Sequence, residues 1–344
     1  MNPYDFVRII WSKPGPRRPG PTHERFQGLS GRLEATITAL TPIFLPDHKQ
    51  GDPQQFLRST AGDRPYLIPG SSLKGLFRNL VETVGGGAWW FLEDDHSSKI
   101  PAAFRRPSDI DRLDAACRMF GFMGEKGGRD QAPILAGHVN FGDAVCVQAK
   151  PHAPFYTVAL LGPKSRHSIW YLDANRQYVA GRKFYFHATN APIKAKAGAR
   201  KDLSTHIQPL DTGSVFTFQA AFDNVLEEDF NLLLYAMVLE PEMRHKFGYA
   251  KPAGLGSVAI TLNWIKTVDR LARYRAGGGG ITHYAGDALT NFVKGRIASF
   301  VDDRSSITLS DLRRIWAWPA RHELQYPGEA WFDANPTTPI SGTP

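Results

Sequence analysis

A Pro-Gly-Ser-Ser sequence directly before an apolar pattern is the first place where this chain is predicted to bind a ligand. The apolar residues between positions 73 and 84 lie on one face of a helix, and Ser71 or Ser72 is its predicted N-cap. Free N–H groups and the helix dipole favour an anion at such a helix start. Lys74 and Arg78, one turn apart, would add phosphate contacts. The alternative is a capped surface helix with two solvated cations.

A glycine-rich segment, Gly248 to Gly256, is the second candidate site. Its glycines, among them Gly254, let the backbone approach a phosphate closely. Lys246 and Lys251 supply positive charge around it. The segment lacks the GxxxxGK[ST] pattern, which argues against a nucleoside triphosphatase. The alternative is a plain turn between a helix and a strand.

Residues 164–201 combine nine basic residues with a single acidic one, Asp173. Six aromatic residues are interleaved with this charge. Bases stack on aromatic rings while cations follow the phosphates, so the mixture favours single-stranded RNA. In the alternative interpretation the aromatic residues belong to a local core and the charges are solvated. The predicted RNA contacts are Arg182, Lys183, Lys194 and Lys196.

Acidic and histidine side chains supply the candidates for catalysis. Asp47, His48 and Asp52 lie in a long loop, where carboxylates would hold a hard cation or act on an RNA 2′-hydroxyl. Glu93 to His96 form a second cluster of this kind. A solvated loop is the alternative for both. His23, His48 and His138 are candidate general bases for a metal-independent ribonuclease.

Composition narrows the function classes. The chain has 344 residues, a net charge of +8 and a pI near 9.4, which favours an acidic partner, with nucleic acid first. The two cysteines, Cys117 and Cys146, exclude a disulfide framework and a four-cysteine zinc site, so no metal site is predicted from them. The sequence lacks a signal peptide and any run of about 18 apolar residues, so we expect a cytoplasmic protein without membrane contact.

A strand, helix and strand occur twice along the chain, with insertions in the first copy. This order predicts an α+β fold with a ferredoxin-like, RRM-type antiparallel sheet core, present once or duplicated. In the second copy, Asn224 and Glu227 have the spacing of a capping box. The predicted strands are 32–40, 138–147, 213–221 and 257–262, and the predicted helices are 73–84, 111–119, 224–239 and 287–300.

The domain organisation follows from this order. Residues 150–212 lack the pattern of a regular packed core and are predicted to form a basic, aromatic, thumb-like insertion. The other segments are an extended basic arm at 1–30, a first half at 31–149 with a flap at 85–135, a second half at 213–268 with the glycine-rich loop, and a C-terminal helical extension at 281–330.

Three motifs resemble those of the RAMP superfamily of CRISPR-associated proteins, in the same order. They span residues 31–262, and two further segments resemble one branch of its type III-like members. The motifs are Ile68 to Gly75 with Arg78, Gly137 to Ala144 after Phe120-Gly121, and Gly254 to Val258; the further segments are Tyr4 to Val7 and Gly181 to Tyr185.

The resemblance is to the Csm/Cmr-type backbone subunit of a guide-RNA effector complex. It implies that copies of the chain form a filament on guide RNA (crRNA), pair it with target RNA, and bind other CRISPR-associated subunits. The guide backbone would be contacted by Ser71, Ser72, Lys74, Arg78 and the glycine-rich loop with Gly254 and Gly256.

By the same resemblance, Asp52 would cut target RNA, with Asp47 as the second choice and a divalent cation such as Mg²⁺ as cofactor. The stretch before Asp52 lacks the glycines usual there. One alternative is therefore a passive scaffold that leaves cutting to a separate nuclease. A metal-independent, guide-processing ribonuclease of the same superfamily is the other.

Overall fold

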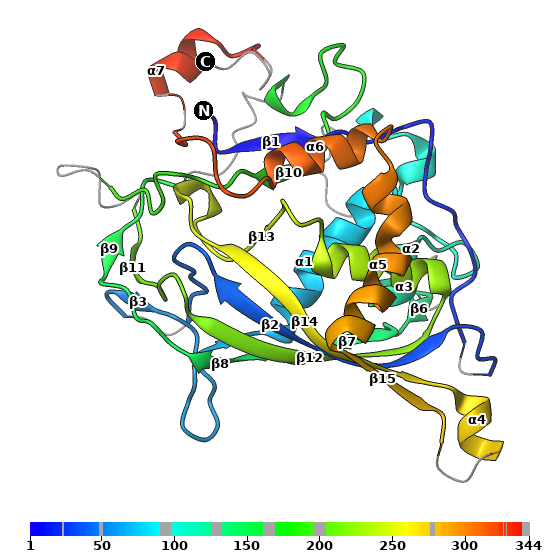
Figure 1. Cartoon of the computed structure of the whole chain (residues 1–344). Coiled ribbons are helices and arrows are strands. Elements are labelled where there is room, and N and C mark those ends of the chain that lie inside the picture. Colours follow the sequence, from blue (N-terminus) through cyan, green and yellow to red (C-terminus); the bar gives the residue numbers. More distant parts are fainter. Residues whose placement is uncertain are drawn as a thin grey trace.

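A computed structural model describes residues 1–22, 24–47, 51–89, 98–124, 132–160, 169–195, 204–275, 279–325, 327 and 329–338. The molecule is built on one large, eight-stranded sheet, and helices α1, α3 and α5 cover one of its faces (Figure 1). Within the described part of the chain, no helix is both long and apolar enough to cross a bilayer. The helices are α1 (Gly70–Val84), α2 (Ala115–Phe120), α3 (Glu227–Val238), α4 (Arg270–Arg275), α5 (Gly286–Asp302), α6 (Ile307–Ile315) and α7 (Glu329–Ala334), with short 3₁₀ helices η2 (Ala102–Phe104) and η5 (Lys251–Ala253).

The central strand of the large sheet is β2 (Leu29–Ala39), antiparallel to β12 (Val215–Val225) on one side and β14 (Ser257–Val268) on the other. Its apolar residues alternate with polar ones, so Leu33, Ala35 and Ile37 are fully buried under the helices. The sheet is completed by β4 (Leu67–Ile68), β7 (Val139–Phe141), β8 (Ala144–Gln148), β13 (His245–Lys246) and β15 (Ile281–Ala285).

The connections confirm the predicted fold class. Helix α1 joins β2 to the strands β7 and β8, and α3 joins β12 to β13 and β14. Because the strand order is β14-β2-β12-β8, the two halves interleave in one sheet and form a ferredoxin-like core once within the described residues. The predicted strand at 138–147 is two strands, separated by a turn at Gly142 and Asp143.

The N-cap prediction for α1 is wrong. The helix begins at Gly70, so Ser71 and Ser72 lie inside its first turn, and no side chain of the preceding residue caps it. A carboxylate oxygen of Asp143, from the turn between β7 and β8, accepts a hydrogen bond from the Gly70 N–H at 2.8 Å. A negative group of the protein itself therefore already stabilises this helix start.

The capping-box prediction for Asn224 is also wrong, since α3 begins at Glu227. The Asn224 side chain holds the N-terminal arm instead. Its Oδ1 accepts hydrogen bonds from the N–H groups of Gln27 and Gly28 at 2.8 and 3.0 Å, and its Nδ2 donates to the carbonyls of Thr22 and Arg25. Asn224 therefore attaches this arm to the end of β12.

The expectation that residues 150–212 lack a regular core is wrong for part of them. Strand β10 (Arg182–Tyr185) pairs with β1 (Tyr4–Val7), and Phe184 and Phe186 are buried in the main core. Gly181 precedes this pair at φ 148°, where a Cβ atom would lie 2.2 Å from the Val7 carbonyl oxygen. The remaining short strands are β3 (Gln54–Gln55), β9 (Phe155–Tyr156), β11 (His206–Gln208), β5 (Phe122–Met123) and β6 (Ile134–Leu135).

Candidate nucleic-acid interface

Three of the lysines predicted to bind RNA lie near one another: Lys183 in β10, Lys246 in β13 and Lys251 in η5. The charge of Lys251 acts on both of the others, although β10 is far from β13 and η5 in the sequence. Burial, and then the positive charge of Lys251, lower the pKa of Lys183 to about 8 and that of Lys246 to about 7. Burial also lowers the pKa of Lys251. Among the described residues, no carboxylate forms an ion pair with any of the three. We call them the lysine cluster.

Aromatic rings hold the two outer ammonium groups of the lysine cluster. The Lys183 Nζ lies 3.7 Å from the ring centroid of Tyr4 and 5.0 Å from that of Tyr185. The Lys251 Nζ lies 5.6 Å from the Tyr185 centroid and donates to the Gly248 carbonyl at 2.8 Å. Ring faces attract cations without neutralising them, so the cluster keeps its net positive charge.

Lys246, the third lysine of the cluster, is buried next to the glycine-rich segment. The Lys246 Nζ is buried and donates to the carbonyl of Gly254 at 3.1 Å and to the Ser257 hydroxyl at 3.2 Å. Gly256 has φ 83°, and a Cβ there would lie 1.9 Å from the Phe247 carbonyl oxygen. The turn itself therefore requires this glycine, while Lys246 adds positive charge from below the surface.

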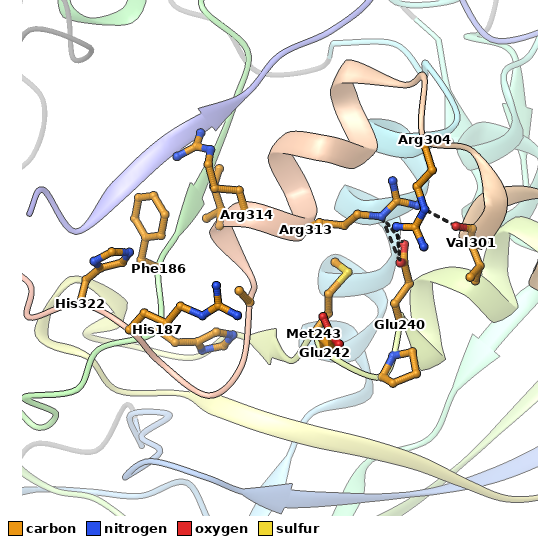
Figure 2. A pocket seen from close by; sticks show the side chains of 14 residues that line it. Phe186, His187, Glu240, Glu242, Met243, Val301, Arg304, Arg313, Arg314 and His322 are labelled. Carbon is orange, nitrogen blue, oxygen red and sulfur yellow. Dashed lines mark hydrogen bonds and ion pairs between the residues drawn. The ribbon is translucent and has the colours of Figure 1, made fainter.

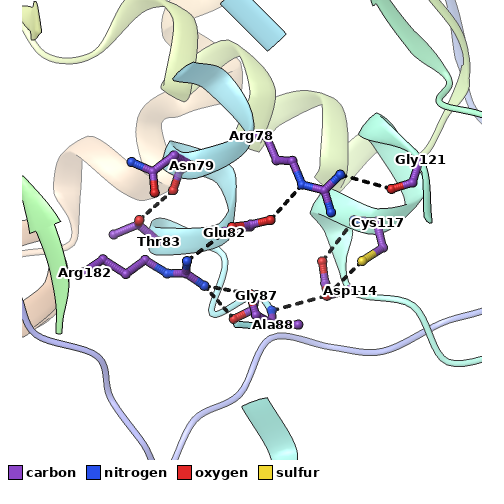
Figure 3. Close-up of polar contacts among 10 residues, drawn as sticks. All are labelled: Arg78, Asn79, Glu82, Thr83, Gly87, Ala88, Asp114, Cys117, Gly121 and Arg182. Carbon is purple, nitrogen blue, oxygen red and sulfur yellow. Dashed lines mark hydrogen bonds and ion pairs between the residues drawn. The ribbon is translucent and has the colours of Figure 1, made fainter. Parts of the chain in front are cut away.

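Two predicted RNA-binding arginines lie in an internal network instead (Figure 3). The carboxylate of Glu82, at the end of α1, accepts from Arg78 at 2.8 Å and from Arg182 at 3.2 Å. Arg182 is buried and also donates to the carbonyls of Gly87 and Ala88. Because these bonds join α1 to β10, we leave Arg182 out of the proposed interface.

The remaining predicted residues of α1 lie on its outer side. Ser71 is exposed, and Ser72 and Lys74 are half-buried. Burial, and then the positive charge of Arg78, lower the pKa of Lys74. This face therefore offers hydroxyl groups and one ammonium group, but its helix start is already capped by Asp143.

Asp52 meets a histidine that no motif of the sequence includes. Its carboxylate is hydrogen bonded and ion-paired to Nδ1 of His206, in β11. The imidazole stacks on the ring of Tyr156, with centroids 4.3 Å apart and planes within 5°. No spacing in the sequence joins positions 52 and 206; only the parallel pairing of β3 with β11 brings them together.

Asp47 and the other candidates are not assembled with this pair. The Asp47 N–H donates to the Gln55 carbonyl across the β3 loop. His138 is buried, with Nδ1 2.8 Å from the Asp223 carbonyl oxygen. In the described ranges no group of three or more His, Cys, Asp and Glu side chains is suited to hold a metal ion. His23, His48, Glu93 to His96 and Lys196 lie outside the described residues.

One hydrogen bond connects the strand that carries His206 to the glycine-rich segment. The hydroxyl groups of Thr205 and Tyr249 are 2.8 Å apart, and the Tyr249 N–H donates to the Phe44 carbonyl. Figure 1 shows β3, β9 and β11 together at one end of the molecule. Lys194 lies beside β9, with its Nζ 5.1 Å from the Phe155 centroid. The glycine-rich segment and the Asp52–His206 pair are therefore parts of one connected region.

A pocket of about 640 Å³ beside α6 is a second basic site (Figure 2). Three of the four arginines that line it have carboxylate partners inside the protein. Arg313 binds the Glu240 carboxylate at 2.8 Å, and Arg314 binds Asp5 at 2.6 Å. Unlike the lysine cluster, this pocket carries its own counter-charges, so it has less need of an external anion.

Comparisons show that this chain is similar to one protein family and to chains of solved structures. A family model described as the RAMP superfamily matches residues 36–259, which is most of the chain. A solved chain described as "Type IV-B CRISPR Complex" is 18% identical, with 67% of this chain and 90% of that chain covered and a TM-score of 0.38. No curated protein matches this chain.

Proposed function

Because this chain belongs to the RAMP superfamily, we propose that it is a backbone subunit of a CRISPR effector complex that binds guide RNA along its phosphates. The lysine cluster is the observation that carries the proposal. Lys183 and Lys251 share the ring of Tyr185, and Lys246 lies beneath them, without a carboxylate partner in the described part of the chain.

Such a cluster favours a polyanionic ligand on physical grounds. Burial, and then repulsion by the charge of Lys251, disfavour the charged forms of Lys183 and Lys246, and the lowered pKa values of both express this cost. A phosphate group removes the cost by pairing with the ammonium groups. We propose further contacts to the same RNA molecule from Ser71, Ser72 and Lys74 on α1 and from Lys194 beside β9.

The proposed roles in target binding and in assembly rest on the resemblance to the RAMP superfamily. We propose that the bound guide is presented to a complementary target RNA, and that copies of this chain and other CRISPR-associated subunits, including a separate nuclease, complete a type III-like complex. The type III-like assignment rests on the resemblance of Tyr4 to Val7 and Gly181 to Tyr185. These two segments are the paired strands β1 and β10, and β10 carries Lys183.

Salt tests this proposal directly. Binding of single-stranded RNA releases counterions, so the logarithm of the association constant should fall with the logarithm of salt concentration by about 0.7 for each phosphate neutralised. Filter binding of the full chain to single-stranded RNA at rising salt measures this slope. A slope near zero would mean that no phosphate is neutralised, and the proposed function would be wrong.

Affinity for RNA should also fall as the pH rises from about 7 to about 9. In the free protein, Lys246 and Lys183 lose their protons with pKa values of about 7 and about 8, whereas phosphates favour the protonated forms. Unfolded lysine keeps its proton in this range, so the free energy of unfolding of the RNA-free chain should rise with pH over the same interval.

Lys183→Arg is the matched variant for this pH dependence. Arginine stays charged throughout the interval, so the variant should bind RNA with a flatter pH profile than the wild type. Fluorescence anisotropy with labelled RNA at each pH checks both profiles. Identical profiles for the two proteins would show that the Lys183 charge is not part of the interface.

A further inference from the structure

Another pocket, of about 660 Å³, lies at the end of β14 and β15 that carries α4. Figure 1 shows α4 at the tip of these two strands, apart from the helices that cover the sheet. The volume is that of a small-molecule site. The described residues that line the pocket include four cationic side chains and one carboxylate, namely Arg32, Lys266, Arg270 and Arg273, and Asp223. We call it the arm pocket.

The register of the sheet brings two of these cations together. Arg32 in β2 and Lys266 in β14 are directly opposite each other in the antiparallel pair, so their side chains lie on the same face of the sheet. Both are exposed, and neither forms an ion pair within the described part of the chain. Like charges at directly opposed positions destabilise a strand pair. A bound anion would remove this cost.

Helix α4 adds two more cations. Arg270 and Arg273 are three residues apart, a spacing at which like charges on a helix also repel each other. Asp223 pairs with Arg270, which also donates to the Ser30 hydroxyl at 3.2 Å. Four cations and one carboxylate leave an excess of three positive charges in the arm pocket. The pocket beside α6 differs, because three of its four arginines are paired with carboxylates.

Apolar and aromatic side chains line the same pocket. Val268 and Ile281 are directly opposite in the pairing of β14 with β15, and Phe222 contributes a buried ring. Tyr274, in α4, also lines the pocket, and its side chain is 89% exposed. Nucleic-acid bases stack on exposed aromatic rings, and phosphates pair with arginine. The lining therefore offers one surface for a base and another for a phosphate.

We infer that the arm pocket binds a nucleoside phosphate. Arg32, Lys266 and Arg273 pair with the phosphate, and the base stacks on Tyr274. The ligand is either a free nucleotide or one nucleotide of an RNA strand, because both present the same base and phosphate.

This site is separate from the lysine cluster and goes beyond the proposed function. The lysine cluster reaches the start of β14, where Lys246 donates to Ser257. Lys266 lies nine residues further along the same strand, from 257 to 266, which is about 30 Å at the rise of a β-strand. One small ligand therefore cannot contact both sites.

Binding of ATP to the full, RNA-free chain tests the inference. Isothermal titration calorimetry in EDTA, which keeps ATP free of divalent cations, measures the affinity. Arg32→Ala/Arg273→Ala should weaken ATP binding by about 100-fold, because each charged hydrogen bond contributes about tenfold or more. Tyr274→Ala should weaken it by about tenfold through the lost stack. Inorganic triphosphate, which has no base, should bind equally to the wild type and to Tyr274→Ala.

Arg304→Ala/Arg321→Ala is the matched control. Both arginines line the pocket beside α6, and the double variant loses the same net charge. It should keep the wild-type affinity for ATP. An equal loss of affinity in the two double variants would show an effect of total charge and would overturn the inference.

A second titration distinguishes the two sources of the ligand. Single-stranded oligoadenylate is added to Lys183→Ala/Lys251→Ala, with and without Arg32→Ala/Arg273→Ala. A further loss of RNA affinity in the fourfold variant identifies a nucleotide of an RNA strand, whereas ATP binding without such a loss identifies a free nucleotide. If neither ATP nor RNA affinity depends on Arg32 and Arg273, the inference is wrong. RNA binding by the wild type would then leave the proposed function standing.

Discussion

Replacing Lys183 and Lys251 together by alanine is expected to weaken RNA binding by about 100-fold. A hydrogen bond between charged groups contributes about 1.5 kcal/mol or more, so removing two such bonds costs about 3 kcal/mol of binding free energy. The salt dependence should decrease as well, by about 0.7 in slope for each lysine removed. Fluorescence anisotropy with single-stranded RNA at two salt concentrations measures both effects.

Lys13→Ala/Lys294→Ala is the control for this prediction. Both side chains are exposed and lie outside the lysine cluster, and the double variant loses the same net charge. A loss of affinity that is equal in the two double variants would show that only total charge matters. In that case the lysine cluster is not the binding site.

Replacing Arg118 by alanine is expected to lower the free energy of unfolding by about 3–5 kcal/mol. Arg118, in α2, binds the Asp229 carboxylate, in α3, through two hydrogen bonds of 2.7 and 2.6 Å. The two side chains are only 1% and 3% exposed, so the variant leaves a carboxylate buried without its partner. Urea unfolding followed by circular dichroism measures the difference.

Two variants separate this cost from a general loss of charge. Arg18→Ala removes an exposed ion pair with Glu228 and should cost less than about 1 kcal/mol. Arg118→Met/Asp229→Leu replaces the whole buried pair with apolar side chains and should recover most of the lost stability. If Arg118→Ala is as stable as the wild type, α2 is not held to the core by this bond.

Two segments singled out together in the sequence are neighbours in the structure. Tyr4 to Val7 and Gly181 to Tyr185, on which the proposed type III-like assignment rests, pair as β1 and β10. Antiparallel pairing places Tyr4 opposite Tyr185, and both rings surround the Lys183 ammonium group. The paired segments thus build part of the lysine cluster.

Local patterns predicted the elements well where one face of each is buried. The alternation of Leu33, Ala35 and Ile37 predicted β2, and the apolar positions between 73 and 84 predicted α1. Capping was predicted poorly at α1 and α3. At α1, the Gly70 N–H donates to Asp143, from a distant turn, rather than to a neighbouring serine. At α3, the Asn224 side chain binds the N-terminal arm rather than the start of the helix.

The amino-acid order by itself determined the fold class, the family and the basic character of the chain, because periodicity, short motifs and charge are properties of neighbouring residues. The tertiary structure decided which charges are available. Glu82 neutralises Arg182 in the interior, whereas Lys183 and Lys251 meet without a carboxylate partner among the described residues, and Asp52 gains His206 from a segment 154 residues away. Ion pairing and burial act through space, and local sequence patterns do not encode which distant side chains will meet.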